Sequence, residues 1–376
     1  MIATLVQALK FSRLQVLVLL LLFTRTAHAQ DSFVLDPSIF DQASVEQERL
    51  GKVYLSDMYL SPRFDYAEPR SGKFLLGKSY VAADWTRSEL VSGQFAFGTK
   101  SLLGVPARYG TVNPEEFAVI GAYAQLSSDF GRFRLGLQPI PFGLEGGILE
   151  ANLRFERSFL YQNSWMGIRD LGFGYSISNA GFFNDWLIHN GESGQDLDNQ
   201  VWFTTRVGFH KNFFTGGLSA QTGKTNPLST DPTGKLASTP AGSLSTTGIN
   251  IDLGAKFRFF NLFFAYRSKD FEASLEATTI DVYQINTDTH PNTGHIDFFV
   301  PYKETWGFLL RYDYFDFKDS VTPTSQSYTI GTCLRSQYET SNLYLYGSRN
   351  IMPAPQNDSH QILLVWRVSP FALKQR

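Results

Sequence analysis

Acidic and basic side chains gather in one stretch of the chain that has no strand-like alternation. Residues 139–169 hold as many acids as bases, and one more acid follows them; the set is Glu145, Glu150, Arg154, Glu156, Arg157, Arg169 and Asp170. Opposed charges of this kind sort ions when they lie in a confined passage, and on an open surface they are only solvated. Phe155, Tyr161 and Trp165 supply apolar anchors, and loops longer than about 12–15 residues are usually functional or disordered. We expect an ordered loop that folds inward.

A second set of basic side chains recurs on one face of alternating segments. After Gly131, for example, Phe133 and Leu135 alternate with Arg132 and Arg134. If the apolar faces point outward, the inward side chains that set ion selectivity are Arg132, Arg134, Arg206, Lys256, Arg258, Arg311 and Arg335, and Arg267, Arg367, Asp252 and Asp313 share their side. Rings of arginine and lysine favour anions. In the alternative, which stays open, these bases only neutralise loop carboxylates and impose no selectivity.

Catalytic and metal-binding patterns are weak in this chain. His189 is followed by Asn190, Gly191, Glu192 and Ser193, but Asn-Gly is also a strong turn signal. The pair His290 and His295 has no evident third ligand, and a zinc site needs at least three. The sequence contains no GxSxG, HExxH or phosphate-binding loop in a usable context. We therefore predict no catalytic residue, no metal site, no cofactor and no enzymatic activity.

Alternating segments of about the length that crosses a membrane recur along the chain. In residues 306–314, Trp306, Phe308 and Leu310 share one face while Gly307 and Arg311 share the other. Counting such segments predicts sixteen strands, among which 52–60, 73–83 and 272–285 alternate poorly and the link 286–303 is unusually long. Sixteen strands enclose an aqueous channel, whereas about eight would be filled by side chains.

The connections between these segments alternate between short and long. Short turns are expected near 129–131, 179–181, 210–212 and 260–261, and long polar connections at 100–117, 139–169, 190–199 and 224–247. Outer-membrane barrels have tight periplasmic turns and long external loops. A soluble β-sandwich is the alternative, but nothing in a sandwich requires that alternation. The fold class we predict is all-β: a transmembrane antiparallel β-barrel of about 16 strands with an inward-folded constriction loop at about 139–169.

The N-terminal residues have the pattern of an export signal. Lys10 and Arg13 precede an apolar run at 14–23, and Ala27-His28-Ala29 is a small-x-small cleavage site. The expected organisation is a secretory signal peptide at 1–29, a short periplasmic lead-in at 30–50 and the barrel at 51–376. Aromatic residues are 15% of the chain, with 31 glycines, one cysteine (Cys333) and a formal net charge of −2. That charge gives no reason to expect a nucleic-acid partner.

Several short runs resemble the phosphate-selective O- and P-type porins. They are Pro141-Phe142-Gly143-Leu144-Glu145, Glu156-Arg157-Ser158, Arg169-Asp170-Leu171-Gly172 and Asn190-Gly191-Glu192, with further likeness in 306–313, 328–335 and 362–371. The resemblance implies a sixteen-stranded, usually trimeric channel. The chain departs from that family in having no lysine cluster of the kind that concentrates phosphate. It also ends Phe371-Ala372-Leu373-Lys374-Gln375-Arg376 rather than on an aromatic residue.

The function expected from the sequence is passive transport. We expect an outer-membrane porin of a Gram-negative bacterium, a water-filled channel for small hydrophilic solutes with a modest preference for anions such as phosphate. Its expected partners are outer-membrane lipid, small anionic or neutral solutes and two further copies in a homotrimer. The alternatives are an outer-membrane barrel hydrolase and a non-conducting structural or adhesive barrel.

Overall fold

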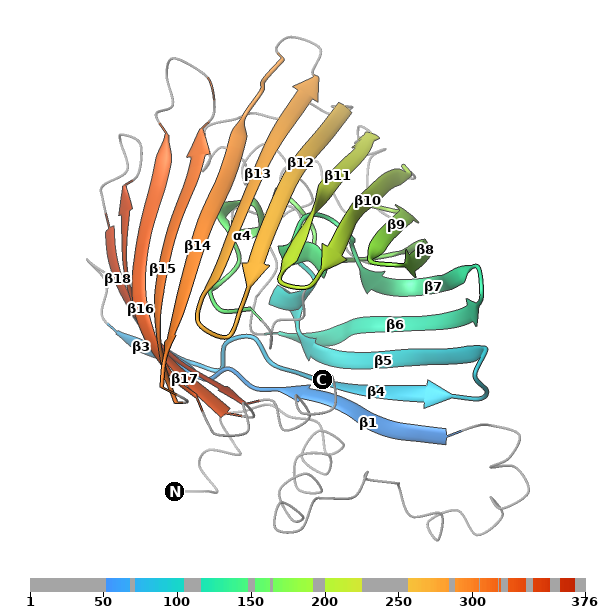
Figure 1. Cartoon of the computed structure of the whole chain (residues 1–376), viewed down its shortest axis with the longest axis horizontal. Coiled ribbons are helices and arrows are strands. Elements are labelled where there is room, and N and C mark those ends of the chain that lie inside the picture. The colour runs from blue at the N-terminus through green and yellow to red at the C-terminus, as the bar shows by residue number, and fades with distance from the viewer. Residues whose placement is uncertain are drawn as a thin grey trace, which may run out of the picture.

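One antiparallel sheet accounts for nearly all of the described chain, and it curves round into a barrel (Figure 1). The computed structural model describes residues 52–67, 72–104, 116–147, 153–162, 165–191, 200–224, 256–283, 288–303, 305–316, 318, 324–335, 341–351 and 359–368. The expected signal peptide and lead-in, together with Glu150 and Asp252, lie outside these residues.

The sheet has eighteen strands joined mainly between neighbours in sequence. They are β1 (Lys52–Tyr59), β2 (Arg63–Ala67), β3 (Lys73–Leu75), β4 (Tyr80–Thr86), β5 (Val91–Thr99), β6 (Phe117–Ser128), β7 (Gly131–Pro139), β8 (Arg169–Asn179), β9 (Phe182–His189), β10 (Trp202–Lys211), β11 (Phe214–Lys224), β12 (Lys256–Arg267), β13 (Glu272–Tyr283), β14 (Asn292–Tyr302), β15 (Trp306–Asp316), β16 (Ser325–Arg335), β17 (Ser341–Ile351) and β18 (Ser359–Val368). The α-helix α4 (Phe159–Gln162) and two 3-10 turns complete the described elements. None of the described helices has the length and apolar character that would carry it across a membrane.

The first four strands behave as one interrupted hairpin. Tyr59 pairs with Tyr80 in the β1–β4 ladder, and Arg63 pairs with Leu75 in the β2–β3 ladder in almost the same register. On its other side this hairpin meets the last strand, because β2 pairs with β18 and Leu60 bridges to Val368. Counted as two long strands, the hairpin brings the total to sixteen, as expected. This hairpin thus lies between the two ends of the sheet: β1 pairs with β4, and β2 makes a short ladder with β18.

Strand β15 shows why these segments are strands. Its burial alternates residue by residue, with Trp306, Phe308 and Leu310 exposed and Leu309 and Arg311 buried. Apolar side chains on the outer face and polar or packed side chains on the inner face are the pattern of a lipid-facing barrel. The predicted faces of this strand are confirmed.

The third quarter of the chain differs from the prediction. The expected turn at 260–261 is wrong, because β12 runs through it and turns only at 268–271. Asn261 suggested a turn, but its side chain is buried on the inner face and donates to Glu276 at 2.9 Å and to Thr278 at 2.8 Å. The long link expected at 286–303 contains an additional strand, β14. The prediction divided β12 into two strands and omitted β14, so the two errors cancelled in the count of sixteen.

The two rims of the barrel differ in their connections. Short turns of two to four residues at 129–130, 180–181, 212–213 and 268–271 lie at one rim, and the strand ends that the long connections join, those of β5 and β6, β7 and β8, and β11 and β12, lie at the other. We call these the short-turn rim and the long-loop rim. By the general rule for outer-membrane barrels, the first is periplasmic and the second external.

The outer face of β12 offers a test of the membrane assignment. Replacing the outward-facing Leu262 by Arg should cost about 2–4 kcal/mol, because a charge near the bilayer midplane loses its hydration. Urea unfolding in phosphatidylcholine vesicles measures this cost. Leu262→Met is the matched control and should cost less than about 1.5 kcal/mol. Equal costs for the two variants would contradict a lipid-facing position.

Candidate functional site: the loop inside the barrel

The connection between β7 and β8 folds into the barrel. Pro139 pairs with Arg169, so the chain leaves and re-enters the sheet at adjacent points of the long-loop rim. Its helix α4 lies within the curve of the sheet (Figure 1). Most described side chains of the loop are buried, among them Phe142, Glu145 and Leu160. The expected inward-folded loop is confirmed, and we call residues 140–168 the internal loop.

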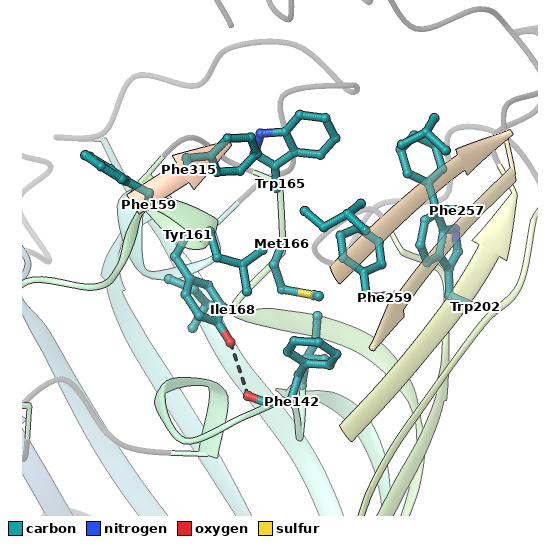
Figure 2. Packing of buried hydrophobic residues seen from close by; sticks show 14 of the residues in the cluster. Phe142, Phe159, Tyr161, Trp165, Met166, Ile168, Trp202, Phe257, Phe259 and Phe315 are labelled. Atoms are coloured by element: carbon teal, nitrogen blue, oxygen red, sulfur yellow. Dashed lines mark hydrogen bonds between the residues drawn. The ribbon is translucent and has the colours of Figure 1, made fainter. Parts of the chain in front are cut away.

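An apolar cluster attaches the internal loop to the wall of the barrel (Figure 2). Phe142 meets the ring of Phe259 edge-on with centroids 6.3 Å apart, and Trp165 stacks on Phe315 at 5.5 Å. Within the loop, the hydroxyl of Tyr161 donates to the carbonyl of Phe142 at 3.2 Å (Figure 2). Burying each such aromatic side chain contributes about 1.5–3 kcal/mol. The loop is therefore packed as a core is packed.

Arg311 on β15 is the charged centre of the contact. Its side chain is 4% exposed, and its Nη2 lies 2.6 Å from Glu145 Oε1. Its Nε lies 3.0 Å from carboxylate oxygens of both Asp297 and Asp313. Its Nη1 donates to the backbone carbonyl of Glu156. One guanidinium thus joins two strands of the wall to two points of the internal loop.

Glu145 is the partner of Arg311 on the loop. Its Oε2 accepts hydrogen bonds from the backbone N–H of Ser158 at 2.8 Å and from the Ser158 hydroxyl at 2.7 Å. Burial by itself would raise the pKa of this carboxyl, but the positive charges of Arg311, His295 and Arg157 outweigh burial and lower the pKa to about 2. Glu145 is therefore ionised at neutral pH and holds both halves of the loop.

A second group of ion pairs holds the middle of the loop. Arg154 Nη2 lies 3.1 Å from Glu272 Oε1 on β13. Glu156 lies between Lys78, at 3.5 Å, and Arg367 on β18, at 3.6 Å. Burial would raise the pKa of Glu156, but Lys78, Arg367 and Arg63 together lower it to about 2. Each described carboxylate of the loop thus has a cationic neighbour.

Gly143 occupies a position where a side chain would be strained and would displace Glu276. Its φ of +61° lies in the left-handed region, and a Cβ there would stand 1.9 Å from Glu276 Oε1. Glu276, on β13, accepts the backbone N–H of the next residue, Leu144, at 3.0 Å. The N–H of Gly143 donates to Ser219 on β11 at 2.9 Å. Close approach of the bare backbone to the wall explains the glycine.

The base of the loop contains a buried polar network. Asp170 Oδ2 lies 2.6 Å from His189 Nδ1, and His189 Nε2 lies 2.8 Å from Thr204 Oγ1. The same Asp170 oxygen accepts the backbone N–H of Gly191. Asp170 and Thr204 are fully buried and His189 is 2% exposed. The network connects β8, β9 and β10 where the internal loop ends.

The basic residues that were predicted to line the lumen fall into three groups. Arg311 and Arg367 are inward and are paired with the internal loop, while Arg335 is inward with its guanidinium over the ring of Phe299. Arg132, Arg134 and Arg206 lie on the opposite wall, on β7 and β10. Lys256 and Arg258 form the third group.

Lys256 and Arg258 were expected inside, and this expectation is wrong. They are exposed and alternate on β12 with the buried Phe257 and Phe259, which pack in the cluster of the internal loop. The two bases therefore share the outer face with Phe260. Apolar side chains identify the lipid-facing side of a strand only where the other side faces water. On β12 the inner side faces the internal loop, so apolar side chains lie there as well.

Arg132, Arg134 and Arg206 form no ion pair among the described residues. Arg132 is exposed, and Arg134 Nε donates to the neutral Gln125 at 2.8 Å. Arg206 lies over the rings of Phe183 and Phe263, and its Nε has no hydrogen-bond partner. We call these three residues the wall cations.

A small pocket of about 60 Å³ lies between the internal loop and the wall. Its lining includes Glu145, Arg154, Arg267, Glu272, His295 and Asp297. Sequence reasoning missed Glu272, Glu276 and His295 as partners of the loop, and Asp297 as a partner of Arg311. His295 and Asp297 lie on the unpredicted strand β14, whose alternation of Ile296 and Phe298 with polar residues was the available signal. Within the described part of the chain, no group of three or more histidine, cysteine or acidic side chains could hold a metal ion.

Comparison with known proteins supports the fold. No protein-family model and no curated protein matches the sequence. An anion-selective porin from Comamonas acidovorans matches the structure with a TM-score of 0.61 at 13% identity, over 85% of this chain and 99% of that one. OmpT of Vibrio cholerae in a trimer form matches with 0.58 at 12%, over 85% and 99%, and Salmonella typhi OmpF in complex with daunomycin with 0.56 at 10%, over 85% and 98%. At these identities the likeness establishes the fold, which is that of outer-membrane porins.

The low pKa of Glu145 makes the attachment of the loop sensitive to acid. Its folded-state pKa of about 2 lies below the ordinary value of 4.5, so its contribution to stability is complete above pH 4.5 and is lost as the pH falls towards 2. Glu145→Gln should reduce the free energy of unfolding by roughly 3–5 kcal/mol at pH 7, because it leaves Arg311 without its loop partner. The difference between the two proteins should shrink between pH 4.5 and 2. Urea unfolding across this range measures it.

Glu89→Gln is the matched control for this prediction. Glu89 is exposed in the turn between β4 and β5, far along the chain from the loop. Its replacement by Gln removes the same charge as Glu145→Gln does. Its difference from the wild type should stay below about 0.5 kcal/mol at pH 7. A Glu145→Gln difference that does not change with pH would show that Glu145 is not held ionised by Arg311.

Proposed function

We propose that this chain is a passive porin of the outer membrane of a Gram-negative bacterium. Small hydrophilic solutes diffuse through its lumen past the internal loop, and no chemical step takes place. The channel has a modest preference for anions. The observation that carries the proposal is the separation of charges inside the barrel: the loop carboxylates lie within 4.0 Å of cationic groups, whereas the wall cations form no ion pair among the described residues.

The pairing of the loop carboxylates with basic side chains weakens the negative field of the internal loop. Glu145 and Glu156 are each within 4.0 Å of at least one arginine or lysine, and Arg154 is paired with Glu272. A paired charge contributes little field at a distance. The internal loop narrows the passage without making it strongly attractive to cations.

The wall cations, which form no ion pair among the described residues, leave a positive field on the opposite wall. Arg132 and Arg206 are linked by register across four strands, from Arg132 to Ser176, then to Asp185 and then to Arg206. Asp185 is the one acid in this row; it lies directly opposite Arg206 and attracts its charge without forming an ion pair with it. On the same wall Asp84 accepts hydrogen bonds from Ser56 and Gln94. Three unpaired bases against these two acids support a preference that is modest.

Phosphate is the anion that we propose within this preference. Guanidinium groups bind phosphate through two parallel hydrogen bonds, and the wall cations include three of them. The resemblance of 141–145, 156–158 and 169–172 to the O- and P-type porins supports the same solute, and the anion selectivity of the Comamonas porin supports the wider preference for anions. We also propose a homotrimer, supported by the trimer form of the Vibrio cholerae protein.

Planar bilayers test the channel and its selectivity together. The wild type should show stepwise conductance and a reversal potential shifted towards the anion in a potassium chloride gradient. Arg132→Gln/Arg134→Gln/Arg206→Gln should abolish or reverse the shift, because it removes the unpaired positive field. Lys256→Gln/Arg258→Gln removes two bases of the same chemistry from the outer face and should leave the shift unchanged. Absence of conductance steps would refute the porin, and equal effects of the two variants would refute the role of the wall cations.

A barrel hydrolase is the second candidate, because one arrangement has the geometry of a catalytic triad. Asp170, His189 and Thr204 lie in the order acid, base and hydroxyl, with separations of 2.6 and 2.8 Å. A nucleophile must touch its substrate, and the Thr204 side chain is buried. This burial supports a structural role for the network.

His189→Ala separates the two readings of this network. In the structural reading the purified wild type hydrolyses neither p-nitrophenyl esters nor peptides, and the variant loses about 1–3 kcal/mol of stability, because the buried Asp170 and Thr204 each lose the hydrogen bond to His189. Ester or peptide hydrolysis by the wild type that His189→Ala abolishes, while conductance persists, would establish the hydrolase.

A further inference from the structure

A group of basic side chains lies on the outside of the barrel, near the long-loop rim. Lys224 on β11 and Lys256 on β12 are directly opposite each other in the register, and Arg258 is opposite Thr222 two pairs further in. All three side chains are exposed. We call them the outer cationic patch. Its three charges lie on adjacent strands, which are about 4.8 Å apart.

The patch lies next to the apolar band that contacts lipid. On β12 the same face continues from Arg258 to Phe260, Leu262 and Phe264, all exposed, and on β11 it continues to Leu218. Arg258 is two residues, or about 7 Å, beyond Phe260 along the strand. A lipid whose acyl chains cover Phe260 and Leu262 has its headgroup at the level of the patch.

Like charges face each other in this patch. Directly opposed lysines on an antiparallel pair repel and destabilise the sheet unless an anion lies between them. The one acid on the neighbouring strand face is Asp281, opposite Arg258, and it is engaged by His290 Nδ1 at 2.9 Å. The guanidinium of Arg258 is held over the ring of Tyr283 at 5.3 Å. The patch therefore carries an excess of positive charge, with one of its groups oriented.

We propose that the outer cationic patch binds the phosphate groups of an anionic lipid in the outer leaflet. Arg258 supplies paired N–H donors to phosphate oxygens, and the two ammonium groups supply point charges beside it. A lipid phosphate fits better than free phosphate, because the apolar band below the patch holds the acyl part of the same molecule. This site is on the opposite face of the wall from the lumen and does not depend on the proposed transport.

Copurification and binding of lipopolysaccharide test the proposal. The full-length protein and the variant Lys224→Gln/Lys256→Gln/Arg258→Gln are purified from outer membranes in mild detergent, and bound lipid is counted by native mass spectrometry. Each removed charge should weaken the binding of added lipopolysaccharide about fivefold. The triple variant should therefore lose nearly all copurified lipid while it keeps the wild-type conductance.

The control removes three lysines from the short-turn rim. Lys211, Lys269 and Lys303 are exposed there, and Lys211→Gln/Lys269→Gln/Lys303→Gln makes the same change of net charge. This variant should retain lipid as the wild type does. Equal retention by both variants overturns the proposal. Displacement of the lipid by millimolar inorganic phosphate would make the site one for free phosphate, and a change in oligomeric state with lipid retained would assign the patch to another copy of the chain; both overturn it.

Discussion

The buried guanidinium of Arg311 is the interaction on which the interior of this barrel depends. Moving a charged side chain out of water costs several kcal/mol, and only close opposite charges with good geometry offset that cost. Arg311 donates hydrogen bonds to the Glu145 carboxylate and the Glu156 carbonyl on the loop, and the carboxylates of Asp297 and Asp313 on the wall lie close to its Nε. Without Arg311, Asp297 and Asp313 would repel one another, and burial of Glu145 inside the barrel would cost free energy that no opposite charge on β15 offsets. The charges of the loop and the wall therefore stabilise each other in this arrangement.

The apolar cluster and the ion pairs both attach the loop to the wall, at different places. Phe142, Trp165 and their neighbours exclude water from one end of the contact, which strengthens the nearby ion pairs. Glu145 then links residues that are more than ten positions apart in the loop, because it bonds both Arg311 and Ser158. A loop of nearly thirty residues acquires a defined shape from two anchors of different physical kind. Its shape follows from the wall it meets as much as from its own sequence.

Much of this architecture could be predicted from the sequence, since a strand in a membrane has a side-chain period of two. The faces of β15, the short turns at 129–130 and 180–181 and the inward loop all follow from that period and from the lengths of the connections. The period does not say which face is inside. On β12 the loop supplies an apolar interior, so Phe257 and Phe259 are inward and Lys256 and Arg258 are outward. That inversion needs knowledge of a contact between residues more than 100 positions apart. The partners His295 and Asp297 were missed for a related reason: their strand was taken for a loop.

Arginine therefore has three different roles in this one sheet, and its surroundings decide which. Arg311 is surrounded by carboxylates and is structural. Arg134 has a neutral partner and leaves its charge available to the lumen. Arg258 lies beyond an apolar band on the other face, where its charge meets the membrane interface. Counting basic residues along strands treats the three alike and predicts a uniformly cationic channel. In the channel that we propose, the field comes instead from the difference between paired and unpaired groups on the inner face, so a chain with a net negative charge can still favour anions.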